Sequence, residues 1–119
     1  MLGDGWAEVS IRVYSDVKKA SELAPILPAG GVVDPKGRAW ALTVGEDFNE
    51  PSLQVLLAQA EELLSVHSAT FEALPPGSQV DLFIGWSPRT PQENVTMSAS
   101  LIESLGKLGA KVVFDTYTG

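Results

Sequence analysis

Cysteine is absent from this chain of 119 residues. Its absence excludes a disulfide framework, a thiolate nucleophile and a metal site with cysteine ligands. Long apolar runs are also missing, since no stretch approaches the roughly 20 residues that a membrane-spanning helix needs. The opening residues, MLGDGWAEVSIRVY, lack the basic segment and the apolar run of a signal peptide. We therefore expect a soluble, cytoplasmic protein that has no membrane partner.

Positive charge is missing from the middle of the chain, because no lysine or arginine occurs between Ala39 and Pro88. The acids of this segment account for the whole net charge of −7. They are Glu46, Asp47, Glu50, Glu61, Glu62, Glu72 and Asp81. Nucleic-acid binding draws much of its affinity from basic contacts to phosphates, so we expect no nucleic-acid partner. The balance instead favours a basic protein as partner.

The composition is that of an ordinary globular protein, with 45% hydrophobic and 19% charged residues. The length of the chain fits one domain over 1–119. Alternating apolar residues predict strands over 8–14, 38–44, 79–86 and 111–117. Residues 94–97 alternate weakly and are a candidate hairpin strand. Residues 28–36 are interpreted as a loop because of their proline and glycine content.

Three helices are predicted from apolar residues at helical spacing. The first is short, follows a cap at Ser15 or Asp16 and ends before Pro25. The second is long, continuous and amphipathic, is capped by Asn49 or Ser52, and ends at Pro75. The third begins after Ser98, which is suited to capping it, and ends at Gly109.

The resulting order is β-α-β-α-β-(β)-α-β, which predicts the α+β class. Strands in which apolar and polar residues alternate indicate a sheet that is buried on one face only and is mostly antiparallel. The helices need that face to bury their apolar stripes. We therefore expect a two-layer sandwich of four or five strands with three helices on one face. The open face and edges of the sheet are then free for a partner or for a second copy.

The segment VDLFIGWSPRTPQENVTMSASLIESLGKLGAKVVFDTY resembles the closing half of a bacterial domain-of-unknown-function family, number four-two-seven-nine. IRVYSDVKKASELAPILP and RAWALTV are similar to its opening strand and helix and to its tryptophan strand. The proline-rich turn at 87–91 departs from the small residues often found there. The resemblance implies a small stand-alone bacterial protein with an accessory role and with no assigned catalytic residue. By analogy, it raises the expectation of an immunity protein that neutralises a toxin.

Candidate catalytic residues each have a simpler structural interpretation. His67, the single histidine, lies on the apolar stripe of the long helix, and we expect it to be a half-buried residue that packs against the core. Glu46, Asp47 and Glu50 could hold a hard cation, but acids are also favourable at a helix N-terminus. Asp81 and Asp115 fall on the polar sides of two strands and are expected to be surface residues. Nucleophile and phosphate-binding motifs are absent, so we expect neither an enzyme nor a bound metal or cofactor.

We interpret the stretch GWSPRTPQENVTMS mainly as a turn, with a binding loop as the second interpretation. Two prolines stiffen it, and Trp86 and Arg89 are of types that recur as interface anchors, although Trp86 can equally pack into the core. We therefore predict a non-catalytic module that binds a basic partner, of which an immunity protein is the most specific form. Its predicted partner-binding residues are Glu46, Asp47, Glu50, Glu61, Glu62, Glu72, Trp86 and Arg89. The alternatives are a small-ligand sensor and a homodimeric regulatory domain.

Overall fold

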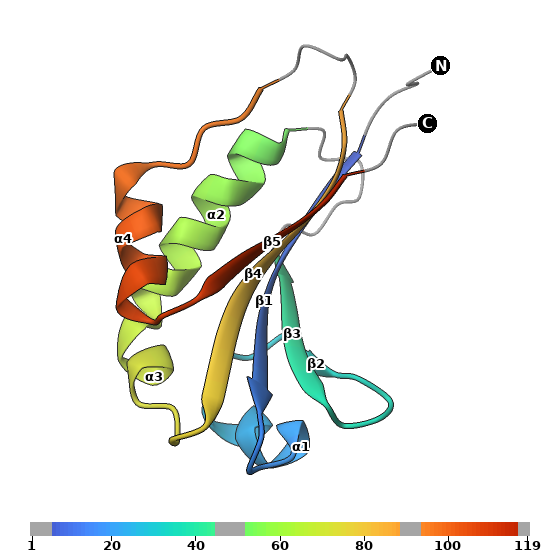
Figure 1. The fold of residues 1–119 in the computed structure, drawn as a ribbon, viewed down its shortest axis with the longest axis vertical. Coiled ribbons are helices and arrows are strands. Elements are labelled where there is room, and N and C mark those ends of the chain that lie inside the picture. Colours follow the sequence, from blue (N-terminus) through green and yellow to red (C-terminus); the bar gives the residue numbers. More distant parts are fainter. Residues whose placement is uncertain (1–5, 45–51, 89–93, 117–119) are drawn as a thin grey trace.

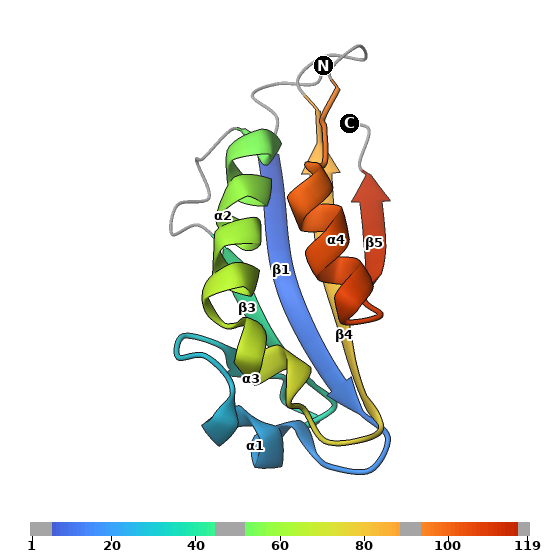
Figure 2. The same cartoon turned by 90° about the vertical axis from the view of Figure 1, so that its left-hand side faces the viewer.

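A five-stranded sheet carries a layer of helices on one face, as Figures 1 and 2 show for a computed structural model that describes residues 6–44, 52–88 and 94–116. The strands are β1 (Trp6–Ser15), β2 (Val32–Val33), β3 (Ala39–Val44), β4 (Ser78–Ser87) and β5 (Lys111–Thr116). Their order across the sheet is β2-β3-β1-β4-β5. The β4–β5 pair is parallel and the other three pairs are antiparallel. The predicted α+β class and mostly antiparallel sheet are confirmed.

The helical elements are α1 (Ala20–Leu23), a 3-10 turn η1 (Ala24–Ile26), α2 (Leu53–Val66), α3 (Ser68–Glu72) and α4 (Ala99–Lys107). Helices α2, α3 and α4 lie over the same face of the sheet, and α1 lies at one end of it (Figure 2). The described residues thus contain one α-helix more than the three predicted. We call α2, α3 and α4 the helical layer.

The core lies between this layer and the inner face of the sheet. Val9 pairs with Ile84 and Ile11 with Leu82 across β1 and β4, and all four are at most 1% exposed. Because side chains alternate along a strand, the residues between them point to the opposite, open face. The alternation read from the sequence therefore fixes which residues face the helices.

The long helix predicted up to Pro75 is in fact two helices that meet at His67. This residue has φ −105° and ψ 23°, so the helical path breaks there, and it serves both as the C-cap of α2 and as the N-cap of α3. At the other end, Ser52 caps α2 through its hydroxyl, which accepts a hydrogen bond from the Val55 amide. His67 is half-buried, as its place on the apolar stripe predicted.

The first helix begins later than the sequence suggested. The Ser15 hydroxyl accepts hydrogen bonds from the amides of Val17 and Lys18, which holds these residues in a turn. The helix therefore starts at Ala20. Pro25 does not stop the chain from turning, because it occupies the first turn of η1, where its missing amide costs no hydrogen bond.

The prediction of a hairpin strand at 94–97 is wrong. This segment is irregular and is fixed to α2 by the Gln54 side chain. The Gln54 amide nitrogen donates to the Thr96 carbonyl (2.6 Å), and the Thr96 amide donates to the Gln54 carbonyl (2.9 Å). Ser98 then caps α4 as predicted, its hydroxyl accepting from the Leu101 amide. A short strand, β2, instead occurs inside the predicted loop at 28–36.

Candidate functional site

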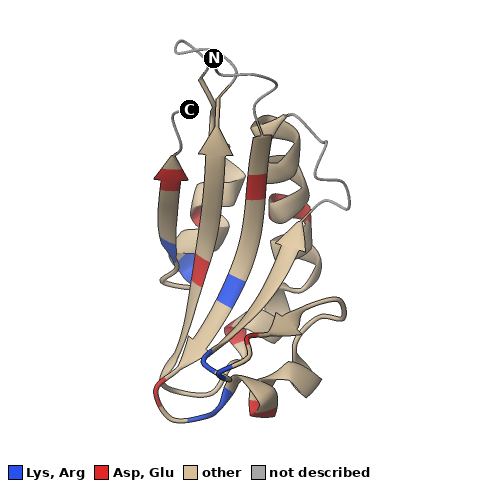
Figure 3. Cartoon of the chain, turned by 90° about the vertical axis from the view of Figure 1, so that its right-hand side faces the viewer, with Lys and Arg blue, Asp and Glu red and all other residues tan. Residues whose placement is uncertain are grey.

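The helical layer is the acidic side of the described molecule. Its helices contain four acids and one base, which are Glu61, Glu62, Glu72, Glu103 and Lys107. The open face of the sheet is nearly balanced, with three acids and two bases among its described strands β1, β4 and β5 (Figure 3). These are Glu8, Asp81, Asp115, Arg12 and Lys111. The two faces thus differ in charge.

The acids predicted on one exposed flank point in different directions. Glu61 lies between α2 and α4, where its carboxylate accepts a hydrogen bond from the Ser98 hydroxyl and lines a small groove with Gln54 and Thr96. Glu61 therefore holds the segment before α4 in place. Glu62, one residue later, is turned by about 100° and is exposed on the outer side of α2.

Four members of the predicted set fall outside the described residues. They are Glu46, Asp47, Glu50 and Arg89. Trp86 is described, and it lies on the helix side of β4 opposite Ala7 of β1. It is partly buried and packs against the core, which is the structural alternative considered for it.

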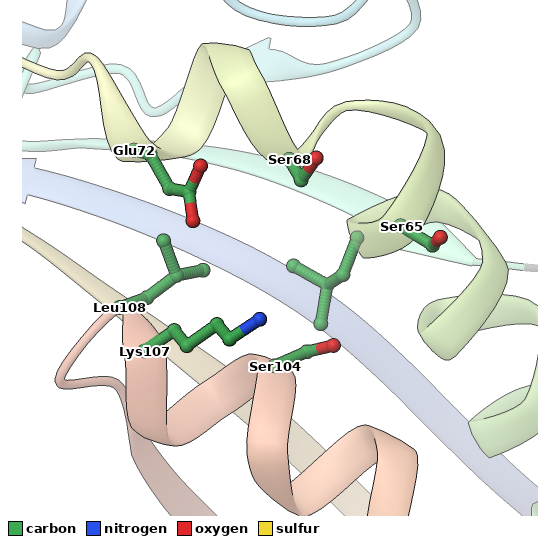
Figure 4. A pocket seen from close by; sticks show the side chains of 7 residues that line it. Ser65, Ser68, Glu72, Ser104, Lys107 and Leu108 are labelled. Carbon is green, nitrogen blue, oxygen red and sulfur yellow. The ribbon is translucent and has the colours of Figure 1, made fainter.

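A pocket of about 320 Å³ opens between α2, α3 and α4 (Figure 4). Glu72 reaches into it from α3, and Lys107 reaches into it from α4. Its remaining lining consists of three serine hydroxyls and two leucines, namely Ser65, Ser68, Ser104, Leu64 and Leu108. A carboxylate, an ammonium group and hydroxyls in one pocket can bind a small polar molecule that carries both charges. No sequence motif pointed to this pocket, because it depends on the packing of three helices.

The open face of the sheet has a charged pair at its centre that the sequence did not reveal. Arg12 of β1 donates to both carboxylate oxygens of Asp81 on β4, at 2.7 and 2.9 Å. The guanidinium lies 4.7 Å from the ring centre of Phe83 and 5.5 Å from that of Tyr14. Asp81 is only 8% exposed. The expectation of a surface aspartate is therefore wrong for Asp81, whose carboxylate is held by Arg12.

Two pKa values reflect this arrangement. The hydrogen bond to Asp81 raises the pKa of the Arg12 guanidinium above its ordinary value. Burial raises the pKa of the Tyr14 phenol, and the nearby charge of Asp81 raises it further. The Arg12–Asp81 pair and its two aromatic neighbours therefore form one connected cluster on the open face of the sheet.

Asp81 and Asp115 are not neighbours, although both belong to the open face. In the register of the β4–β5 pair, Asp81 lies opposite Lys111 and Asp115 lies opposite Gly85. The two carboxylates are therefore separated by four residues along the sheet. They do not form the paired carboxylates that hydrolysis of a glycosidic bond requires.

No group of three or more histidine, aspartate or glutamate residues is placed to hold a metal ion within residues 6–44, 52–88 and 94–116. In the same part of the chain, none of the helices combines the length and the apolar character needed to cross a membrane. Comparison of the chain with family models, with curated proteins and with solved structures gave no match. The resemblance to the bacterial family therefore stays a prediction.

Proposed function

We propose that this chain is a non-catalytic protein-interaction module that binds a basic protein through the outer surface of its helical layer. The observation that carries the proposal is the difference in charge between the two faces: four acids and one base in α2, α3 and α4, against a nearly balanced open face. Opposite charge on a partner would steer the encounter and favour this face over the other.

Exposed aliphatic residues accompany the acids on α2. Val55 is 42% exposed and Val66 is 69% exposed. With Glu62 between them, they are spaced seven and four residues apart, which places all three on one side of the helix. An apolar contact beside a carboxylate suits a partner whose surface combines aliphatic side chains with lysine or arginine.

The most specific form of the proposal is an immunity-type protein of the bacterial cytoplasm that neutralises a basic toxin. Its support is the net charge of −7, together with the resemblance of the C-terminal half to the bacterial family. A toxin with a basic active site would be blocked by an acidic surface that covers it.

The proposal is tested with the proteins encoded by the reading frames adjacent to this one in its native genome. We expect one of them, a basic protein, to bind the immobilised chain with an association rate that falls about tenfold or more between low and high salt. The Glu62→Lys variant should lower the low-salt association rate by a similar factor. Both effects follow from electrostatic steering and are measured by surface plasmon resonance.

The matched control is Asp16→Lys, which changes the net charge by the same amount at an exposed residue. Asp16 directly follows β1, and its amide donates to the carbonyl of Gly77 on the loop before β4, so it lies outside α2. It should reduce the rate much less than Glu62→Lys. Equal effects of the two variants, or binding that is indifferent to salt, would contradict the proposed surface.

A second candidate function, a small-ligand sensor, is favoured by the pocket that Glu72 and Lys107 line. Its ligand would carry both charges, with an anionic group toward Lys107 and a cationic group toward Glu72. A thermal-shift screen of amino acids and other zwitterionic metabolites tests this. A stabilising compound should lose its effect in Lys107→Ala, whereas Lys36→Ala, at an exposed loop residue, should retain it.

A further inference from the structure

Strand β5 is the long edge of the sheet. It pairs with β4 on one side, and no described strand lies on its other side. The opposite edge, β2, is only two residues long, whereas β5 has six. A six-residue edge presents a row of backbone donors and acceptors that another strand can pair with, and proteins usually shorten or interrupt such edges. Strand β5 contains no proline, and its register with β4 runs from Lys111 to Thr116 without a bulge.

Apolar side chains stand beside this edge on the helical side of the sheet. Val112 is 38% exposed and Phe114 is 48% exposed. On the neighbouring helix α4, Ile102 is also exposed, at 56%. Ser104 and Lys107 of α4 line the pocket toward α2 and α3, and the helical period places Ile102 on the opposite flank of α4. In Figure 2, α4 lies on the β5 side of α2, so this flank of α4 is turned away from α2 and α3.

The sequence of β5 is complementary to itself when it is read in the opposite direction. Lys111 and Asp115 are placed symmetrically about Val113, and so are Val112 and Phe114. If two copies pair antiparallel with Val113 opposite Val113, then Lys111 of each copy lies opposite Asp115 of the other. On the other face of the strand, Val112 of each copy lies opposite Phe114 of the other. Opposite charges and aromatic–branched pairs are the favourable cross-strand combinations.

From these observations we infer that the β5 edge is a dimerisation surface, whose partner is the β5 edge of a second copy of this chain. A two-fold axis perpendicular to the sheet passes through the Val113 pair. The two five-stranded sheets then form one continuous sheet, with both helical layers on the same side.

The symmetry singles out this register. In a two-fold antiparallel pair, the residues that lie opposite each other must belong to the same face of the strand. A pairing centred on Val112 places Lys111 opposite Val113, and one centred on Phe114 places Asp115 opposite Val113. Only the pairing centred on Val113 sets the two charges against each other. A parallel pairing of the two strands would set like charges side by side.

The most direct test uses the absence of cysteine from the chain. In the Val113→Cys variant, the two introduced side chains would lie opposite each other at about 5 Å, close enough for a disulfide. We expect mild oxidation to convert most of this variant to a covalent dimer on a non-reducing gel. Val112→Cys is the control, because its two copies would be diagonal, with Cα atoms more than about 7 Å apart, and should not cross-link. Equal cross-linking of both variants, or of neither, would overturn the register.

A second measurement does not depend on an introduced thiol. We expect sedimentation velocity of the unmodified protein to show reversible association toward twice the chain mass of 12.6 kDa. One strand pair is a small interface, so the association should appear between micromolar and millimolar concentration. A wild-type protein that is monomeric throughout this range would refute the inference.

A charge exchange separates this geometry from a nonspecific association. Lys111→Glu should weaken the dimer about tenfold, because it sets two like-charged pairs across the interface. The double variant with Asp115→Lys restores opposite charges in reversed order and should regain most of the affinity. Failure of the double variant to recover, in a protein with unchanged circular dichroism, would contradict the pairing centred on Val113. None of these measurements involves the basic partner proposed above.

Discussion

Replacing Gly31 by alanine is expected to lower the free energy of unfolding by about 3 kcal/mol, a large effect for one added methyl group. A Cβ at this position would lie 2.1 Å from Cε2 and 2.2 Å from Nε1 of the Trp40 indole. Trp40 is 1% exposed and belongs to the core, so the ring cannot move away without displacing its neighbours. Chemical denaturation of the wild type and of the variant measures the loss.

Gly106→Ala is the matched control for this prediction. The same methyl group would meet nothing within 4 Å there, and Gly106 lies within α4. Because alanine favours helix over glycine, this variant should be more stable than the wild type by up to about 1 kcal/mol. Substituting Trp40 by phenylalanine in the Gly31→Ala background should recover part of the loss, since the clashing ring is removed. If Gly31→Ala is as stable as the wild type, the close packing of the indole on Gly31 is wrong.

Removing the Asp81 carboxylate is expected to cost about 2 to 3 kcal/mol of stability, measured by denaturation of Asp81→Leu. The variant leaves the Arg12 guanidinium without its two hydrogen bonds on the open face. We place the cost below that of a fully buried pair, because the Arg12 side chain is 27% exposed and can reach water.

The double variant Arg12→Leu/Asp81→Leu should be close to the wild type in stability, because no unpaired charge remains and the face gains apolar contacts. Glu103→Ala provides the surface reference. It breaks an exposed ion pair with Lys107 at 3.7 Å, four residues along α4, and should cost at most about 0.5 kcal/mol. An Asp81→Leu variant no less stable than Glu103→Ala would show that the Arg12–Asp81 pair contributes little.

The strands were predictable because apolar residues alternate with polar or charged ones along them. Val9, Ile11 and Val13 alternate with Ser10 and Arg12, so the pattern alone indicated both the strand and its inner face. The break at His67 was not predictable from the same kind of pattern, since the apolar stripe continues through it to Phe71. The apolar periodicity predicts which residues face the core, but it does not predict where a helix breaks.

The candidate site was less accessible to sequence reasoning, because its contacts join distant segments. Arg12 and Asp81 are 69 residues apart, and only the β1–β4 register places them opposite each other. The sequence likewise indicates only a surface acid at Glu61, whereas in the structure its carboxylate accepts a hydrogen bond from Ser98, the residue before α4. The charge bias of the middle segment was visible in the sequence, whereas the use of individual acids depends on tertiary packing.

The proposal depends most on where a basic partner touches the molecule, and NMR measures this directly. Amide spectra of the labelled chain are recorded during titration with the basic protein found by the binding experiment. We predict that the largest shifts occur on the outer side of α2 from Val55 to Val66, and that those of the open face around Arg12 and Phe83 stay small. Shifts centred on Arg12 and Phe83, with α2 unaffected, would contradict the account.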